Sequence, residues 1–357
     1  YPLCALWYND NSILYCMGVI FMDYKNLLKM HGNALANAMA AQSAMALPAA
    51  IPSLDLARRG RGHSHPQLSG LADSPRRHGY AVRKRETDTR LSLFGHSFAY
   101  PFFAGPVGAV AMHYSDKYND VTYNAQLVPG CAESGILAFT GDGMDAEVMR
   151  GATDAIKDCQ GVGIPTVKPW NMQMIREKMD LVKASGALAV AMDVDAAGLP
   201  FLKKFVPPAG SKSVEEMKEI IALTDVPFIV KGIMSVKGAV KAAQAGAAAI
   251  VVSNHGGRVL DQSPATAEVL PEIAAAVGGK VKIFVDGGIR TGVDVFKALA
   301  LGADAVLIAR PFVNAVYGGG KEGVRCLVDK LGAELKDTME MCGAATLREI
   351  TGEMIRR

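Results

Sequence analysis

From Ser92 onward, short runs of apolar residues alternate with longer stretches in which apolar positions recur every three or four residues. Continuous Val, Ile and Ala runs are typical of parallel strands covered on both faces, and the longer period is typical of amphipathic helices. The runs predict eight strands, at 102–107, 137–141, 165–169, 188–194, 228–233, 249–254, 282–288 and 305–310. Between and after them, helical patterns lie at 144–158, 171–185, 213–223, 235–245, 264–277, 291–301 and 321–340.

Eight strand–helix units within about 250 residues match the size and order of a TIM (β/α)8 barrel. The chain has 357 residues, which allows two or three domains or one large barrel. The pattern favours an α/β fold with the barrel over 92–357 and an irregular N-terminal segment over 1–91.

The N-terminal segment differs in character from the rest of the chain. Residues 30–90 pass from an Ala- and Met-rich stretch to a basic one with recurring Pro and Gly, without a helical or strand period. A poorly ordered linker is preferred over a nucleic-acid-binding arm, because no aromatic platform accompanies the charge. Two interpretations stay open for 30–90, a frameshifted stretch and a divergent linker. Residues 1–21, before Met22, are expected to be upstream read-through or a fragment edge.

Composition narrows the classes of partner. Thirty-eight basic and 35 acidic residues give a net charge of +3, too balanced to argue for nucleic acid or an anionic membrane. The N-terminal apolar run at 13–22 is shorter than the ~20 residues that a membrane-spanning helix needs. The six cysteines form no C-x-x-C pair, so we expect no zinc or other metal site, and a reducing, cytoplasmic compartment.

Polar residues follow six consecutive predicted strands, where a TIM barrel carries its chemistry. Singly, each has a structural alternative, since Lys231 could be a rim lysine and Asp193 a helix cap. Together they predict an active site. The groups are 168–170, 193–195, 231–232, 253–258, 286–290 and 309–311.

The last two strands predict a phosphate site. Gly287 and Gly288 precede a helix that opens at Thr291, and Arg290 and Arg310 add guanidinium groups. Loops at this position commonly bind phosphate through backbone N–H groups and a helix N-terminus. The chain has no G-x-G-x-x-G after its first strand and no P-loop, which argues against Rossmann-type dinucleotide binding and NTP hydrolysis.

Residues 253–261, Ser-Asn-His-Gly-Gly-Arg-Val-Leu-Asp, resemble the signature of the FMN-dependent α-hydroxy acid oxidase/dehydrogenase family. Residues 229–233 and 285–290 are similar to two further blocks of that family at the right spacing. The resemblance covers about 92–350, and it is strongest to a short bacterial branch of α-hydroxy-acid oxidizing proteins.

The resemblance implies oxidation of a small L-2-hydroxy acid, such as lactate or glycolate, to the 2-oxo acid with FMN. His255 is then the base that takes the substrate proton, and Asp193 holds it. Arg258 grips the substrate carboxylate, and Lys231 stabilises the reduced flavin at its N1/O2 edge.

The remaining cofactor contacts also come from the resemblance. The phosphate group is assigned to the block that starts at Asp286, with Gly287, Gly288, Arg290, Ala309 and Arg310. The isoalloxazine is assigned to Pro106, Val107, Gly108, Thr140, Lys168 and Ser253. Where the family has Gln-x-Tyr, this chain has Lys168-Pro169-Trp170, so the indole N–H of Trp170 is predicted to replace a tyrosine hydroxyl at the substrate.

Two alternatives stay open: another FMN barrel enzyme, similar to type 2 isopentenyl diphosphate isomerase, and a flavin-binding barrel with impaired catalysis. His255 beside Arg258 favours the hydroxy acid, because that pair suits proton abstraction next to a carboxylate. The resemblance further implies dioxygen or a redox carrier as electron acceptor, and a homo-oligomer, by resemblance a tetramer, without stable membrane insertion.

Overall fold

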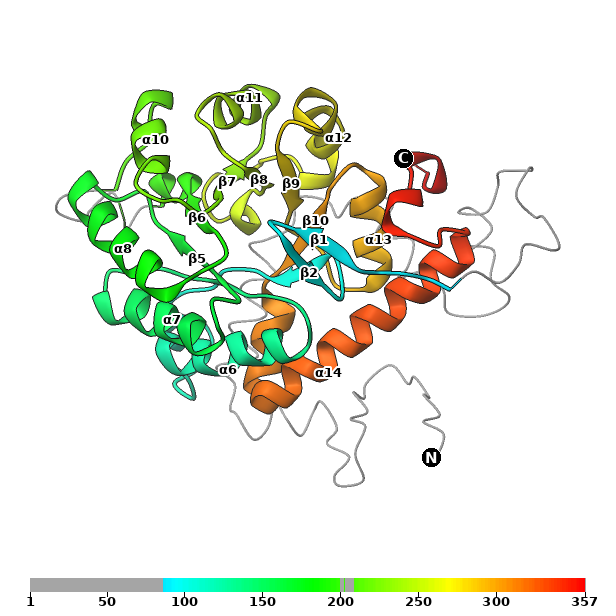
Figure 1. Cartoon of the computed structure of the whole chain (residues 1–357), viewed down its shortest axis with the longest axis horizontal. Helices are drawn as coiled ribbons and strands as arrows, with labels where there is room; N and C mark the ends of the chain where they lie inside the picture. The colour runs from blue at the N-terminus through cyan, green and yellow to red at the C-terminus, as the bar shows by residue number, and fades with distance from the viewer. Residues whose placement is uncertain (1–85, 200–201, 203–208, 357) are drawn as a thin grey trace.

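The computed structural model describes residues 86–199, 202 and 209–356 (Figure 1). The predictions for residues 1–85 lie outside the described residues. Residues 86–90 already contact the far end of the chain, since the Asp88 amide donates to the Ala345 carbonyl at 2.8 Å. A short antiparallel hairpin, β1 (Leu91–Leu93) and β2 (His96–Phe98), follows and leads into the barrel.

Eight parallel strands form the barrel, in the order β3-β10-β9-β8-β7-β6-β5-β4. A parallel bridge from Ala104 to Ala138 joins the first and last strands, which closes the sheet. The predicted TIM-barrel fold is confirmed. The strands are β3 (Phe102–Ala104), β4 (Phe139–Thr140), β5 (Ile164–Val167), β6 (Val190–Asp193), β7 (Phe228–Ile233), β8 (Ala249–Val252), β9 (Lys282–Val285) and β10 (Ala305–Ile308).

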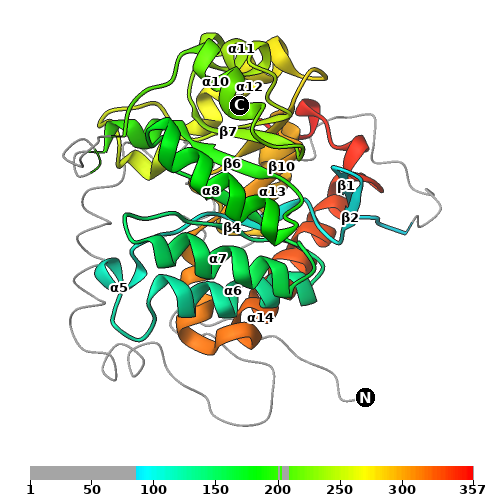
Figure 2. The same cartoon turned by 60° about the vertical axis from the view of Figure 1, so that its left-hand side comes forward.

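Helices surround the barrel (Figures 1 and 2). All seven predicted helical stretches are present. They are α7 (Ala146–Asp158), α8 (Met172–Ser185), α10 (Val214–Ile221), α11 (Val236–Gln244), α12 (Thr266–Val277), α13 (Gly292–Ala300) and α14 (Arg310–Cys342). Short 3-10 helices lie at Val194–Gly198, His255–Gly257, Leu347–Glu349 and Gly352–Met354.

Two helices were not predicted, α5 (Val110–His113) and α6 (Asp120–Glu133), and α14 starts earlier than expected. Pro129 and Gly130 interrupt the pattern of α6, yet Gly130 is what lets α6 approach α14: a Cβ there would lie 2.9 Å from the Val324 Cβ. The dihedral angles of Gly319 and Gly320 kink α14, so the predicted helix at 321–340 is its second half.

Three phenylalanine rings from β3, β4 and β9 meet inside the barrel. The Phe284 ring makes edge contacts with Phe103 and Phe139, at centroid distances of 6.4 and 6.2 Å. All three side chains are fully buried. They fill the interior, so the barrel is a packed core and its chemistry is confined to the ends of the strands. In the part of the chain that the structure describes, no helix is long and apolar enough to cross a membrane.

A buried carboxylate ties the carboxyl ends of β4 and β5 to α8. Asp142 accepts hydrogen bonds from Lys178 Nζ and Trp170 Nε1, both at 2.7 Å, and from the Lys168 backbone N–H at 3.0 Å. The Asp142 side chain is wholly inaccessible and Lys178 is 7% exposed. Because both charges are out of water, each depends on the other for compensation.

We therefore expect Asp142→Ala to lower the free energy of unfolding by about 3–5 kcal/mol, since it leaves the Lys178 ammonium buried without its carboxylate. Urea unfolding followed by circular dichroism measures this. Glu147→Ala is the matched control, because it removes an exposed ion pair with Arg150 and should cost no more than about 1 kcal/mol. Equal effects of the two changes would contradict the buried-pair argument.

Candidate active site

Three adjacent strands bring the predicted catalytic residues together. Asp193 is the last residue of β6, and it pairs in register with Lys231 of β7. His255 lies in the 3-10 turn directly after β8, which is the next strand of the sheet. Parallel neighbours end at the same rim, so these side chains converge at the carboxyl end of the barrel.

Asp193 is buried between two lysines. Its Oδ2 accepts from Lys168 Nζ at 2.8 Å and its Oδ1 accepts from Lys231 Nζ at 3.0 Å. Burial alone would raise the pKa of Asp193, but the charges of Lys168 and Lys231 hold that pKa well below its usual value. Burial opposes the charge on Lys231 too, yet Asp193 and Asp286 raise the pKa of Lys231 above its usual value. Both groups are therefore charged across the physiological range.

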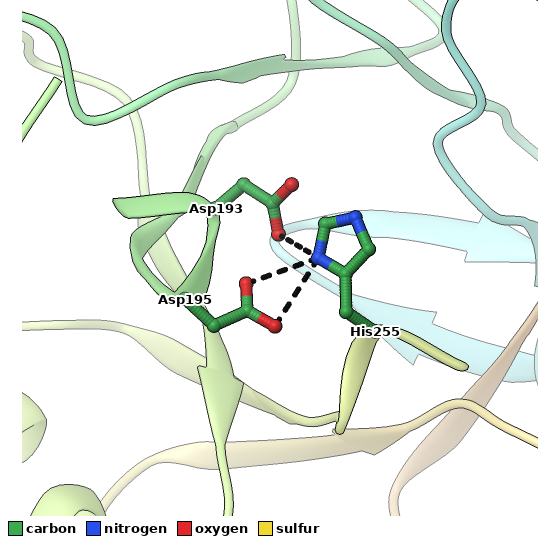
Figure 3. Close-up of side chains that lie close together, drawn as sticks. All are labelled: Asp193, Asp195 and His255. Atoms are coloured by element: carbon green, nitrogen blue, oxygen red, sulfur yellow. Dashed lines mark hydrogen bonds and ion pairs between the residues drawn. The ribbon is translucent and has the colours of Figure 1, made fainter. Parts of the chain in front are cut away.

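His255 faces two carboxylates through one ring nitrogen (Figure 3). Its Nδ1 lies 3.2 Å from both oxygens of Asp195 and 3.6 Å from Asp193 Oδ1. The sequence predicted Asp193 as the partner of His255. In the structure Asp195 is nearer to the imidazole, and the oxygens of Asp193 accept from Lys168 and Lys231. Burial raises the pKa of Asp195, against the hydrogen bond with His255.

The backbone of the loop after β8 sets the direction of the imidazole. His255, Gly256 and Gly257 all have positive φ angles, of 56°, 67° and 77°. Three such residues in succession are strained for side chains other than glycine, and this agrees with the expectation that the two glycines allow left-handed backbone. The Ser253 hydroxyl accepts the His255 backbone N–H at 3.2 Å and fixes the start of the turn.

Arg258 lies at the rim formed by the carboxyl ends of the strands. It contacts a residue that the sequence analysis did not identify. Its Nη2 approaches His113 Nε2 to 3.3 Å. Burial and the charge of Arg258 lower the pKa of His113, so this imidazole is a neutral acceptor. Tyr114 is close enough to Arg258, Arg290 and Arg310 for their charges to oppose the rise in its pKa that burial causes. His113 is the last residue of α5 and Tyr114 follows it, and the sequence pattern did not predict this helix.

The predicted phosphate cradle is partly revised. Burial, and then the charge of Arg310, lower the pKa of Arg290, so the two guanidinium groups are close enough to interact. Gly287 and Gly288 have φ angles of 92° and 79°, and successive left-handed residues form an anion-binding concavity. At the start of α13, however, the Gly292 N–H donates to Glu334 Oε2 and the Asp294 N–H donates to Thr291 Oγ1. Two of the first three amides of that helix therefore have partners within the chain.

Polar atoms without a hydrogen-bond partner lie at or near the ends of β4, β5 and β9. They are Thr140 Oγ1, Thr166 Oγ1 and Asp286 Oδ1, which are three of six such buried side-chain atoms among the described residues; the other three belong to Tyr123 and Asn124 of α6. A bound ligand is one explanation of such atoms. The loops after β3 and β4 run close together, since a Cβ at Gly141 would collide with the Val107 carbonyl. This brings 106–108 beside Thr140, as the assignment of both to an isoalloxazine requires. The residues present fit FMN.

Trp170 lies elsewhere than its predicted role requires. Its side chain is fully buried and its N–H donates to Asp142, so this N–H has a protein partner in place of a substrate. Ligand atoms of Asp193, Asp195 and His255 lie within 4.8 Å of one another, a spacing that could hold a metal ion. The two ammonium groups on Asp193 argue against a cation there, because they already neutralise it.

Comparisons with known proteins point to one family. The FMN-dependent dehydrogenase family matches residues 200–357. A peroxisomal (S)-2-hydroxyacid oxidase of Arabidopsis thaliana is 45% identical over 146 residues, which are 41% of this chain and 40% of that protein. The 4-hydroxymandelate oxidase of Amycolatopsis orientalis is 32% identical over 294 residues, which are 73% of this chain and 81% of that protein.

A solved structure extends the likeness to the fold. A mandelate oxidase variant with (S)-mandelic acid superposes with a TM-score of 0.64 at 26% identity, and covers 88% of this chain and 95% of its own. The chain spans about two fifths of the length of the plant oxidase and most of the length of the mandelate enzymes. With this identity and coverage, the chain belongs to the FMN-dependent dehydrogenase family.

Proposed function

We propose that this chain oxidises a small L-2-hydroxy acid to the 2-oxo acid with FMN. The observation that carries the proposal is His255, held through Nδ1 by carboxylates, with Arg258 three residues further along the same loop. Proton removal next to a carboxylate needs such a base and such a cation. The named activities of the related hydroxyacid and hydroxymandelate oxidases support the same class of substrate.

The reaction removes two protons and two electrons from the hydroxyl-bearing carbon and its oxygen. FMN, when bound, would supply the acceptor for the hydrogen of that carbon together with both electrons, which is a hydride equivalent. His255 takes the hydroxyl proton on Nε2, the ring nitrogen that points away from both carboxylates (Figure 3). The neighbouring carboxylates stabilise the imidazolium that results.

Lys231 contributes a fixed positive charge beside the proposed flavin site. It is 3% exposed and lies 3.0 Å from Asp193 Oδ1 and 3.7 Å from Asp286 Oδ2. A preorganised ammonium in a site of low dielectric stabilises negative charge that develops near it. We assign Lys231 to that role and Lys168 to the same face of the site.

Arg258 has donors to spare for a substrate carboxylate. A guanidinium carries five N–H donors, and one nitrogen, Nη2, faces the neutral His113. The contact restricts the rotamers of Arg258 and leaves the other donors for a two-point hydrogen bond. His113 thereby supports the recognition of the acid group.

The other roles of the site stay predictions. Ser253, the residues 106–108 and Thr140 are proposed to line the isoalloxazine; Asp286, Gly287, Gly288, Arg290, Ala309 and Arg310 are proposed to surround the phosphate end. Dioxygen or a redox carrier is proposed as the final acceptor, with a tetrameric assembly in the cytoplasm. The relatives named above are hydroxyacid, hydroxymandelate and mandelate oxidases, and they favour the hydroxy acid over an activity similar to type 2 isopentenyl diphosphate isomerase.

A flavin assay tests the proposal. The purified chain should release FMN on heat denaturation, and its flavin absorbance should bleach anaerobically with one member of a panel of lactate, glycolate, mandelate and 4-hydroxymandelate. Bound FMN that no 2-hydroxy acid reduces would favour the impaired barrel. Folded protein without FMN would overturn the cofactor assignment.

His255→Ala should slow flavin reduction by about 10²–10⁴-fold while FMN content stays the same, because the imidazole is assigned to the proton and not to the cofactor. Anaerobic stopped-flow absorbance gives the rate constant. His96→Ala, at an exposed position of the β1–β2 hairpin, is the matched control and should leave the rate unchanged. A His255→Ala rate within a few-fold of wild type would refute the assignment.

Arg258→Lys should lower kcat/KM by roughly 10²-fold, because an ammonium gives only a point contact to a carboxylate and lets the α-carbon drift. Flavin content should be unaffected, since the phosphate is assigned to the loops after β9 and β10. Steady-state kinetics decide this, with the exposed Arg150→Lys as the control. Near-normal kinetics would assign Arg258 to a structural role.

A further inference from the structure

We propose that Asp195, and not Asp193, is the carboxylate that positions His255, and that Lys168 causes this division of roles. The inference deepens the proposed function and rests on it for its kinetic part. Asp195 acts through the imidazole without touching the substrate, so it is a positioning residue.

The first support is the distribution of contacts. Each oxygen of Asp193 accepts from a lysine, Oδ2 from Lys168 at 2.8 Å and Oδ1 from Lys231 at 3.0 Å. The oxygen nearest to the imidazole, Asp193 Oδ1, is still 3.6 Å from Nδ1, beyond hydrogen-bond distance. Both oxygens of Asp195 lie 3.2 Å from the same nitrogen. The hydrogen bond from His255 therefore goes to Asp195.

The second support is a backbone that makes room for Asp195. The residue lies in the 3-10 helix Val194–Gly198, directly after β6, so it reaches the same ring from the turn. Opposite it, Gly232 of β7 has a φ of 102°, and a Cβ there would lie 2.6 Å from the Asp195 Cβ. Only glycine leaves this space free, so the Asp195 side chain requires a glycine at this position of β7.

The third support is electrostatic. The charged groups that face His255 are Asp193 and Asp195 from the end of β6, Lys231 from β7 and, through Asp193, Lys168 from the end of β5. Two ammonium groups balance Asp193 before His255 gains a proton. Within the ranges 86–199 and 209–356, no lysine lies within ion-pair distance of Asp195. Burial raises the pKa of Asp195, and the hydrogen bond with His255 is the strongest influence against that rise. The contact thus favours a proton on Nδ1 while Asp195 accepts the hydrogen bond.

Lys168 explains why Asp193 is not the carboxylate that positions His255. Its backbone N–H donates to the buried Asp142, and this fixes the point from which its side chain reaches Asp193. Without the Lys168 ammonium, Asp193 Oδ2 would be free to turn toward Nδ1. Lys168 and Asp195 therefore form a coupled pair, and the loss of one should change the effect of losing the other.

The test compares Asp195→Asn, Asp193→Asn and the double variant Asp195→Asn/Lys168→Gln as flavin-loaded proteins. Asp195→Asn should slow flavin reduction by roughly 10²-fold with little change in the substrate dissociation constant. The added Lys168→Gln should restore about 10-fold of that loss, because it releases Asp193 to the imidazole. A double variant slower than Asp195→Asn alone would overturn the proposal.

The ¹⁵N NMR spectrum of labelled histidine gives a readout that needs no substrate. In the wild type, neutral His255 should carry its proton on Nδ1, with His255→Ala used to assign the signal. Asp195→Asn should give a mixture of tautomers and Asp193→Asn should not. The reverse pattern would assign the role to Asp193. If no hydroxy acid reduces the wild-type flavin, the proposed function fails while this spectrum still decides between the two carboxylates.

Gly232→Ala tests the role of Asp195 in a variant that keeps the Asp195 carboxylate. The added Cβ displaces Asp195 and keeps its charge, so it should cause the same mixing of tautomers and a slower reduction at full flavin content. Gly246→Ala is the matched control, because Gly246, between α11 and β8, has a similar φ of 97° and no atom within 4 Å of an added Cβ. A Gly232→Ala spectrum identical to wild type would contradict the proposal.

Discussion

The mouth of this barrel depends on one buried charge, the carboxylate of Asp193. A buried ionised group without a partner costs several kcal/mol, so the fold must bring cations to it. They come from the end of β5 and from β7, as Lys168 and Lys231. The ends of β5, β6 and β7 are thereby linked through one carboxylate, and the imidazole of His255 joins them from the turn after β8. The geometry of the candidate site and the local stability of the rim thus have the same source.

A second buried carboxylate, Asp142, supports the first. It receives the Lys178 ammonium, the Trp170 indole and the Lys168 amide, so it links the loop after β4 to β5 and α8. Lys168 is therefore held at its backbone by one acid and at its ammonium by another.

The sequence predicted the barrel because its strands are continuous apolar runs, which parallel strands covered on both faces must have. It missed α6 because Pro129 and Gly130 obscure the period, although Gly130 serves the packing against α14. The site residues could be found from their place at strand ends. Their partners could not, since Asp195 and Asp193 differ by 2 positions in the chain and their competition for His255 is decided by where a lysine from β5 reaches.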